Sequence, residues 1–376
     1  MSKLVTLPYS TDQLRAVVEL IRRKPDVIEA FQVDRKRLPS ELRLSDEECT
    51  QLHDAGLMDE QNYQFRPAFR LRREEAGVLV TRDFPRRELD VREPIVNKPV
   101  RRVFPWPDEA QQIHRYVVDR YKTERNLPKR ILNMCCGSGA IALSLTRHWA
   151  GQNGRFDRIL GVDMEELSVR RSEYNRLLNQ YDGHPFARSM EFHEGDLCAC
   201  EDLRPGEMFD LIVAAPPYSL HPPQHTASGH QGGGERGISV VQPLIEQCRE
   251  RLAPGGRLIC QCYSLGDSES PTLLHEVVAT ALQLAPDEAC RAVVPRPDWK
   301  VWRFRDVKCF DTPMPVEYMA VRCSDPTYPF YAAFEKDPEG QMREYVAWIE
   351  RIKKGDAMHR GYSHLHYVMI DYRNPD

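Results

Sequence analysis

The sequence lacks long hydrophobic runs: no stretch in its 376 residues approaches the roughly 20 apolar residues that a membrane-spanning helix needs. The first residues, Met1-Ser2-Lys3-Leu4, also lack the apolar core of a signal peptide. These two absences predict a protein without membrane contact that works in the cytoplasm.

Blocks of like charge are missing as well. The formal net charge is −4 at pH 7, and the charged residues are spread along the chain. Nothing in this balance requires a polyanionic partner such as nucleic acid.

Metal-binding patterns are also scarce. The 11 cysteines are odd in number, and three close pairs lie in or beside expected strands, which is typical of reduced, buried thiols. These pairs are Cys135 with Cys136, Cys198 with Cys200, and Cys260 with Cys262. The loop 219–237 carries His221, His225 and His230 without a carboxylate or cysteine at a familiar ligand spacing. We therefore expect no metal, and favour a loop that closes over substrate, with His221 left open as a general base.

What the sequence does contain is a strand, a tight loop and a helix centred on two glycines. Ile131 and Leu132 supply a buried strand, and residues 140–145 begin a helix after Gly137 and Gly139. Glycine is required where backbone turns sharply and lies against a ligand, because a Cβ atom would fill the ligand's space. A Gly-x-Gly alone is equally typical of an ordinary strand-to-helix turn.

Three later strand ends add to this pattern. The strand 158–162 ends at Asp163, at a distance from the glycines that suits hydrogen bonds to ribose hydroxyls. The segment 190–194 is followed by Gly195 and Asp196, and the strand 209–215 leads into Pro-Pro-Tyr.

This order of motifs resembles the class I S-adenosylmethionine (SAM) dependent methyltransferases. It is most similar to the subgroup whose fourth strand ends in Asn-Pro-Pro-Tyr or Asp-Pro-Pro-Tyr, which includes release-factor glutamine methyltransferases and several RNA base N-methyltransferases. The similarity continues through residues 232–237 and 252–259. The resemblance implies an α/β, Rossmann-like domain with a doubly wound, mostly parallel sheet.

The resemblance also implies a cofactor site for SAM. Gly137 and Gly139 would face its methionine part, Asp163 its ribose hydroxyls and Asp196 its adenine amino group. The full set implied for cofactor binding is Asn133, Cys135, Gly137, Gly139, Asp163, Met164, Asp196 and Leu197. The set implied for catalysis is Asn133, Ala215, Pro216, Pro217 and Tyr218. Simpler interpretations stay open: the two aspartates could merely end strands, and the proline pair could be a rigid strand exit.

Two residues depart from the subgroup. Asn133 stands where an acidic residue usually lies near the cofactor's ammonium group, and a neutral amide stabilises a cation less than a carboxylate does. Ala215 stands where Asn or Asp accepts a hydrogen bond from the substrate nitrogen, and alanine has no acceptor in its side chain. Tyr218 still offers a ring face to a planar or cationic substrate.

Three functions follow from these observations. The first is SAM-dependent N-methylation of a small-molecule acceptor. The second is a SAM cyclase, in which the cofactor's own amine attacks to give azetidine-2-carboxylate and methylthioadenosine. The third is a SAM-binding protein without catalysis.

The domain organisation predicted from the sequence has three parts. Residues 1–82 form a small α+β, winged-helix-like unit, with a capping box at Ser45 and strands expected at 65–71 and 77–80. Its hairpin arginines are offset by Glu74 and Glu75, which disfavours nucleic-acid contact and favours a lid or a homodimer surface. A proline-rich strap follows at 83–107, where Phe104 and Trp106 are candidates for the cofactor pocket wall.

Residues 108–376 then form the SAM-binding domain. Beyond its motifs we expect a helix at 272–283, strands at 300–307 and 316–322, and a closing strand at 366–372. A helical insertion near 328–360, with its helix at 339–352, would lie between the last strands and could add substrate specificity.

Overall fold

The computed structural model describes most of the chain. The described residues are 10–28, 43–55, 57–61, 64–67, 70–73, 78–82, 107–124, 126–152, 154–196, 206–218, 220, 233–295, 314–315, 338–355 and 360–375. The chain divides into two compact units, and each is described by itself. Unit 1 comprises Met1–Arg92 and Arg101–Arg204, and unit 2 comprises Glu93–Val100 and Pro205–Asp376.

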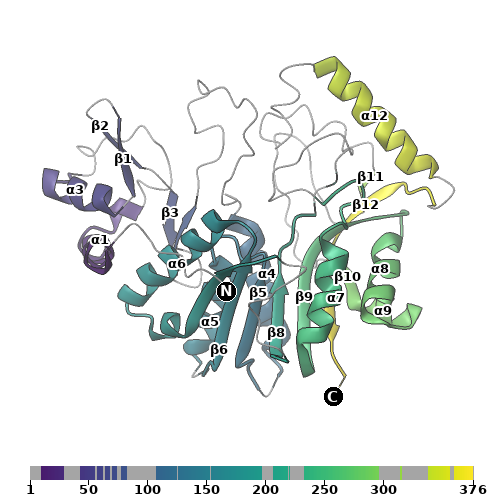
Figure 1. Cartoon of the computed structure of the whole chain (residues 1–376), viewed down its shortest axis with the longest axis horizontal. Helices are drawn as coiled ribbons and strands as arrows, with labels where there is room; N and C mark the ends of the chain where they lie inside the picture. The colour runs from purple at the N-terminus through teal and green to yellow at the C-terminus, as the bar shows by residue number, and fades with distance from the viewer. Residues whose placement is uncertain are drawn as a thin grey trace. The chain divides into compact units, whose positions relative to one another are not determined.

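Unit 1 contains a parallel three-stranded sheet (Figure 1). Its strands are β5 (Arg130–Met134), β6 (Arg158–Asp163) and β7 (Met190–Glu194), in the order β5-β6-β7. β5 and β6 are buried along nearly their whole length, as expected for parallel strands covered on both faces.

Helices connect and cover these strands. The crossovers are α5 (Ala140–Ala150) between β5 and β6, and α6 (Glu166–Tyr181) with the short 3₁₀ helix η2 (Pro185–Ser189) between β6 and β7. The helix α4 (Pro107–Tyr121) precedes β5 and packs on α5. Consecutive βαβ units of this kind bring the carboxyl ends of the strands to one edge of the sheet.

The N-terminal segment of unit 1 is built from short elements. They are α1 (Thr11–Arg23), α3 (Asp46–Asp54), the hairpin β1 (Met58–Gln61) with β2 (Gln64–Pro67), and the hairpin β3 (Arg70–Arg73) with β4 (Leu79–Arg82). Capping boxes at Ser10 and Ser45 begin the two helices, and the one at Ser45 confirms the sequence signal. The single strand expected at 65–71 is divided between β2 and β3.

This segment packs against α6. Leu14, Val17 and Leu52 belong to one buried apolar cluster with Tyr174 and Leu178 of that helix. The face that α1 presents is apolar at three- and four-residue intervals, so the helix gains its stability from this burial.

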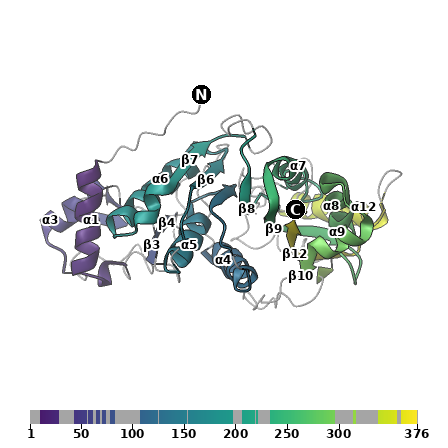
Figure 2. The same cartoon turned by 90° about the horizontal axis from the view of Figure 1, so that it is seen from below.

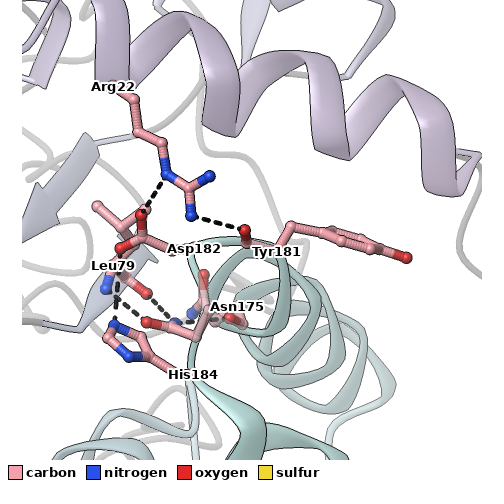
Figure 3. A network of polar contacts seen from close by, with 7 residues as sticks. Arg22, Leu79, Asn175, Tyr181, Asp182 and His184 are labelled. Atoms are coloured by element: carbon pink, nitrogen blue, oxygen red, sulfur yellow. Dashed lines mark hydrogen bonds and ion pairs between the residues drawn. The ribbon is translucent and has the colours of Figure 1, made fainter.

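Polar contacts complete the attachment of the segment to α6 (Figure 3). The Asn179 side chain accepts a hydrogen bond from the Leu79 amide at 2.9 Å and donates to the Leu79 carbonyl at 2.7 Å. The Arg22 guanidinium donates to the carbonyl of Tyr181 at 2.9 Å and lies 3.3 Å from the Asp182 carboxylate. One buried amide thus satisfies both backbone groups of the first residue of β4.

Substituting Asn179 with alanine is therefore expected to lower the free energy of unfolding by about 3 kcal/mol, because two buried backbone groups of Leu79 lose their partners. Urea denaturation monitored by circular dichroism measures the change. The exposed Arg170, which forms an i,i+4 ion pair with Glu166 on the surface of the same helix, supplies the control Arg170→Ala. A loss below 1 kcal/mol for Asn179→Ala would contradict the structural role of this amide.

Unit 2 contains a mixed sheet. Its strands are β8 (Phe209–Ala214), β9 (Leu252–Gly266), β10 (Val293–Pro295), β11 (Met314–Pro315) and β12 (His364–Arg373). β8 and β9 are parallel, whereas β12 runs antiparallel to β9, β10 and β11. The long pairing of β9 with β12 sets Gln261 opposite Met369 and Tyr263 opposite Tyr367.

Helices of unit 2 are α7 (Val241–Arg251), α8 (Thr272–Leu282), α9 (Pro286–Ala292) and α12 (Pro338–Lys354). α8 packs between α7 and α9, which Figure 2 shows from below. α8 and α12 confirm the helices expected at 272–283 and 339–352, and β12 confirms the closing strand and extends it at both ends.

The expected α/β, Rossmann-like class is confirmed by these elements. The predicted domain boundaries stay a prediction. The strap residues 83–106 and the strands expected at 300–307 and 316–322 lie outside the described residues.

Candidate active site

The glycine loop that follows β5 is a tight, left-handed turn. Cys135, Gly137 and Gly139 all have positive φ values, of 52°, 55° and 73°. The Cys136 amide donates to the carbonyl of Val162 on β6 at 3.0 Å, and the Gly139 amide donates to the Cys136 carbonyl at 2.8 Å. The loop is thereby tied to the sheet before α5 begins.

The two glycines of the loop are required for different reasons. A Cβ atom on Gly137 would meet no atom within 4 Å, so the space beside it is open. A Cβ atom on Gly139 would lie 2.8 Å from Cζ of the Phe192 ring. Gly137 therefore borders space that a ligand can use, and packing accounts for Gly139, whose contact with the cofactor stays a prediction.

α6 holds the loop from a second side. The Ser172 hydroxyl donates to the Gly137 carbonyl at 2.8 Å, and the Asn175 amide donates to the Ser138 carbonyl at 2.8 Å. Two side chains one helical turn apart thus fix the backbone carbonyls of consecutive loop residues. Neither was recognised in the sequence as part of the site.

Asp163 ends β6 with its carboxylate directed at the same loop. Its Oδ2 accepts the Gly137 amide at 2.8 Å and its Oδ1 accepts the Glu165 amide at 3.0 Å. Only 8% of the residue is exposed. Burial raises the pKa of this carboxyl to about 6, against the lowering effect of the two amides. Each oxygen keeps lone-pair capacity for a further donor, such as a sugar hydroxyl.

The residues after β6 and β7 complete the group of expected cofactor residues in unit 1. Met164 directly follows Asp163 and is 55% exposed, the one large apolar side chain exposed to this degree in the described part of the chain. Asp196 is exposed after the end of β7, and Leu197 lies outside the described residues. An exposed thioether beside a buried carboxylate suits a ligand with an apolar ring next to a polar sugar.

Asn133 lies inside β5 rather than in the loop. It is fully buried, and its amide group donates to the Met134 carbonyl at 3.3 Å. In the register of the sheet it is paired with Gly161 of β6. Asn133, at the position where an acidic residue is expected, therefore places a neutral side-chain amide within β5.

Unit 2 contains the second group of expected site residues, at the carboxyl end of β8. Ala215 and Pro217 are partly exposed, whereas Pro216 and Tyr218 are buried. A Cβ atom on Gly233 would lie 2.7 Å from the backbone of Tyr218, so the glycine-rich segment before α7 packs directly on this residue. The histidines at 221, 225 and 230 lie outside the described residues.

Three further residues surround Tyr218, and none was identified from the sequence. Its ring contacts those of Tyr263 and Tyr367, with centroids 4.8 and 5.9 Å away. The Gln261 side chain donates to the Tyr218 hydroxyl at 3.2 Å and also to the hydroxyl of Tyr367. The only sequence signal was a polar residue inside a buried strand, between Cys260 and Cys262.

Comparison with known proteins identifies the class of this domain. Residues 115–288 match the family described as the methyltransferase small domain. Over these residues the chain is similar to class I SAM-dependent methyltransferases. The expectation from the motifs is thereby confirmed, and SAM is the cofactor of this class.

Curated relatives of the methyltransferase domain are glutamine methyltransferases. The release factor glutamine methyltransferase of Koribacter versatilis is 28% identical over 177 residues, 43% of this chain and 56% of that protein. That of Bradyrhizobium diazoefficiens is 29% identical over 204 residues, 51% of this chain and 62% of that protein. The ribosomal protein uL3 glutamine methyltransferase of the same species is 30% identical over 142 residues, 35% and 40% of the two chains. The chain thus spans about half the length of these relatives.

Solved structures show a weaker likeness to the chain. The SAM-bound amino pentose methyltransferase of Micromonospora echinaspora is 19% identical, with 42% of this chain and 51% of that chain covered and a TM-score of 0.27.

The relatives correct one expectation. The sequence predicted a small-molecule acceptor, whereas the relatives are named for glutamine of release factors and of a ribosomal protein. The prediction was wrong because the methyltransferase motifs indicate which cofactor binds but not which acceptor is methylated. Ala215 lacks the Asn or Asp side chain that would have indicated an amide acceptor.

The residues of the methyltransferase domain fit SAM. Asp163 provides a buried carboxylate with spare acceptor capacity, Gly137 leaves open space where a Cβ atom would stand, and Met164 provides an exposed apolar surface. Within the described ranges, no group of three or more His, Cys, Asp and Glu side chains could hold a metal ion. No helix of the described residues combines the length and the apolarity needed to cross a membrane.

Proposed function

We propose that the protein is a SAM-dependent methyltransferase that modifies a side-chain amide nitrogen of a protein, with glutamine as the first candidate. The observation that carries the cofactor half is the buried Asp163 carboxylate, fixed by the Gly137 amide beside open space. The names of the relatives support the acceptor. The cytoplasmic location expected from the sequence stays a prediction.

The cofactor-binding residues are assigned roles by their chemistry. The Asp163 carboxylate would accept hydrogen bonds from the ribose hydroxyls, and the exposed Met164 side chain would provide an apolar surface for the adenine ring. The exposed Asp196 accepts from the adenine amino group. The positive-φ loop from Cys135 to Gly139 provides the backbone that lies against the methionine part of the cofactor.

Methyl transfer from SAM depends more on positioning the acceptor nitrogen than on activating the methyl group. When bound, SAM supplies a methyl carbon already activated by its sulfonium. In the transfer, the acceptor nitrogen would gain a bond to this carbon, the carbon–sulfur bond would break with its electron pair left on sulfur, and the acceptor would lose one N–H proton to water. The rigid Pro216-Pro217 exit of β8 and the enclosed Tyr218 ring provide fixed surfaces for the acceptor.

Methylation of defined proteins tests this proposal. The purified protein is incubated with methyl-labelled SAM and either purified release factor or purified ribosomal protein uL3. We expect label in one of the two proteins, S-adenosylhomocysteine in equal amount, and a methylated glutamine in the peptide mass spectrum. Absence of transfer to both proteins contradicts the proposed acceptor.

A second candidate, the SAM cyclase, is favoured by the buried neutral amide of Asn133 in place of an acid. It predicts methylthioadenosine from SAM alone, with no S-adenosylhomocysteine, and a slower reaction after Asn133→Asp. Mass spectrometry of a reaction without acceptor separates the two enzymes. Tight SAM binding without any product would instead indicate the non-catalytic binding protein.

The affinity for SAM is expected to fall as the pH decreases through about 6. Burial raises the pKa of Asp163 to about 6, and only the ionised carboxylate offers both oxygens as acceptors to the ribose. SAM therefore binds preferentially to the protein with an ionised Asp163 carboxylate, which predominates above the pKa. At one pH unit below this pKa, the dissociation constant for SAM should be about tenfold higher. Isothermal titration calorimetry between pH 7 and pH 5 measures this. An Asp163→Asn variant should show weak, pH-independent binding, and an unchanged wild-type affinity at pH 5 would contradict the assignment.

A further inference from the structure

The expected acceptor site lacks a hydrogen-bonding side chain at position 215, which is occupied by alanine. A side-chain amide is a poor nucleophile unless one of its N–H groups is held, and the side chain of Ala215 has no group that accepts a hydrogen bond. If the proposed function holds, another side chain is needed to take the place of this acceptor.

The register of β8 and β9 places one polar side chain beside Ala215. Ala214 pairs with Cys260 in the parallel ladder, and continuing this register by one residue brings Gln261 next to Ala215. Neighbouring residues in register on parallel strands direct their side chains to the same face of the sheet. Cys260 and Cys262 consequently belong to the opposite face.

Gln261 is fully buried, and its side-chain amide is only half satisfied. Nε2 donates to the hydroxyls of Tyr218 and Tyr367. Its carbonyl oxygen Oε1 is buried without a hydrogen-bond partner among the residues that the structure describes. Buried polar atoms almost always have partners, so an atom that lacks one requires an explanation, of which a role in binding or catalysis is one.

The partners of Gln261 connect it to the strand exit. Tyr218 is the last residue of the Ala-Pro-Pro-Tyr segment, and its hydroxyl lies 3.2 Å from that of Tyr367. Tyr263 and Tyr367 are both partly exposed, and their rings pack together with centroids 4.9 Å apart. The two hydroxyls hold the nitrogen end of the Gln261 amide, which leaves the oxygen end for an incoming donor.

We propose that Oε1 of Gln261 accepts the N–H of the acceptor amide and so takes the role that the Asn or Asp at position 215 has in similar methyltransferases. This inference rests on the proposed function and names the residue on which its acceptor half depends. The hydrogen-bonding group has moved from the end of β8 to the neighbouring position on β9, and Tyr218 and Tyr367 keep it in place.

Substitution of Gln261 tests the role. Gln261→Met keeps the length of the side chain but removes the acceptor, and we expect kcat to fall by about 100-fold. The acceptor protein, bound in the presence of S-adenosylhomocysteine, should bind about tenfold more weakly. The melting temperature and the dissociation constant for SAM should stay close to wild type. Gln261→Leu serves as the apolar variant if Gln261→Met does not fold.

Two further variants separate positioning from packing. Gln261→Glu keeps an acceptor oxygen, with both tyrosine hydroxyls able to donate to it, and should retain at least a tenth of the wild-type kcat. Adding Ala215→Asn to Gln261→Met restores an acceptor from β8 and should recover at least tenfold of the lost activity. Cys262→Ala, on the opposite face of the same strand, controls for general damage to β9.

The outcomes are distinct. An active wild type whose kcat is unchanged by Gln261→Met overturns the role of Gln261 and leaves the proposed function standing. Equal losses in Gln261→Met and Cys262→Ala, or no recovery with Ala215→Asn, also overturn it. Failure of the wild type to methylate either release factor or uL3 overturns the proposed function itself.

Discussion

Replacing Asp163 with alanine is expected to raise the dissociation constant for SAM by at least 100-fold. The variant removes a carboxylate that holds two backbone amides, and with it the proposed acceptor for the ribose hydroxyls. A hydrogen bond to a charged group contributes about 1.5–3 kcal/mol. The loss of two such bonds to the ribose hydroxyls therefore weakens SAM binding by more than the variant gains from no longer burying a charge. The Gly137 amide also loses its partner, which loosens the loop that borders the open space.

Isothermal titration calorimetry of the purified variant measures the effect on SAM binding. Asp157→Ala is the matched control, because Asp157 is an exposed carboxylate just before the opposite end of the same strand. Its dissociation constant should remain within twofold of wild type. Equal affinities for SAM in Asp163→Ala and wild type would show that this carboxylate merely ends its strand, the alternative left open by the sequence.

The features predicted correctly from the sequence are local ones. The glycine loop, the strand that ends at Asp163 and the capping box at Ser45 each depend on a few adjacent residues. Apolar runs and glycine positions specify such elements because the backbone conformation is decided within one turn.

The contacts that the sequence did not reveal join distant residues. Gln261 meets Tyr367 across 106 positions, and Asn179 meets Leu79 across 100. The first contact depends on the register of β9 with β12, which side-chain alternation alone does not fix. The amide acceptor was not predicted for a related reason: Gln261, proposed to hold the acceptor in place of a side chain at position 215, lies on another strand.

α6 connects the two parts of unit 1. Its residues Ser172 and Asn175 hold the glycine loop, and Asn179 holds β4 of the N-terminal segment. The Tyr174 hydroxyl donates to the Ala55 carbonyl after α3 at 2.8 Å. The N-terminal segment is therefore anchored to the same helix that holds the glycine loop, so loosening one attachment should reduce the order of the other.

One aromatic ring lies over two glycines of unit 1. Phe192 of β7 is buried, and Gly161 of β6 is its partner in the parallel ladder. A Cβ atom on Gly161 would lie 2.3 Å from Cδ1 of that ring, and one on Gly139 would lie 2.8 Å from its Cζ. The ring thus fills the space that both missing side chains leave, between the sheet and the loop.

Gly161→Ala is therefore expected to lower the free energy of unfolding by about 3 kcal/mol, because the ring must move against a closely packed interior. Urea denaturation measures this loss, and SAM affinity should fall with it, since the displaced ring contacts the loop at Gly139. Gly151→Ala serves as a mild control: its φ is −64°, and its Cβ atom would lie 3.3 Å from the His148 carbonyl oxygen and 3.8 Å from that of Arg147.

A double-mutant cycle identifies the cause of the loss. Phe192→Ala alone should cost about 3–5 kcal/mol through the cavity it leaves. In Gly161→Ala/Phe192→Ala the new methyl group enters that cavity without a clash, so the double variant should be at least 1 kcal/mol more stable than the sum of the single losses predicts. Strict additivity would mean that the ring and the glycine act independently, and that the Phe192 ring is not the reason for glycine at position 161.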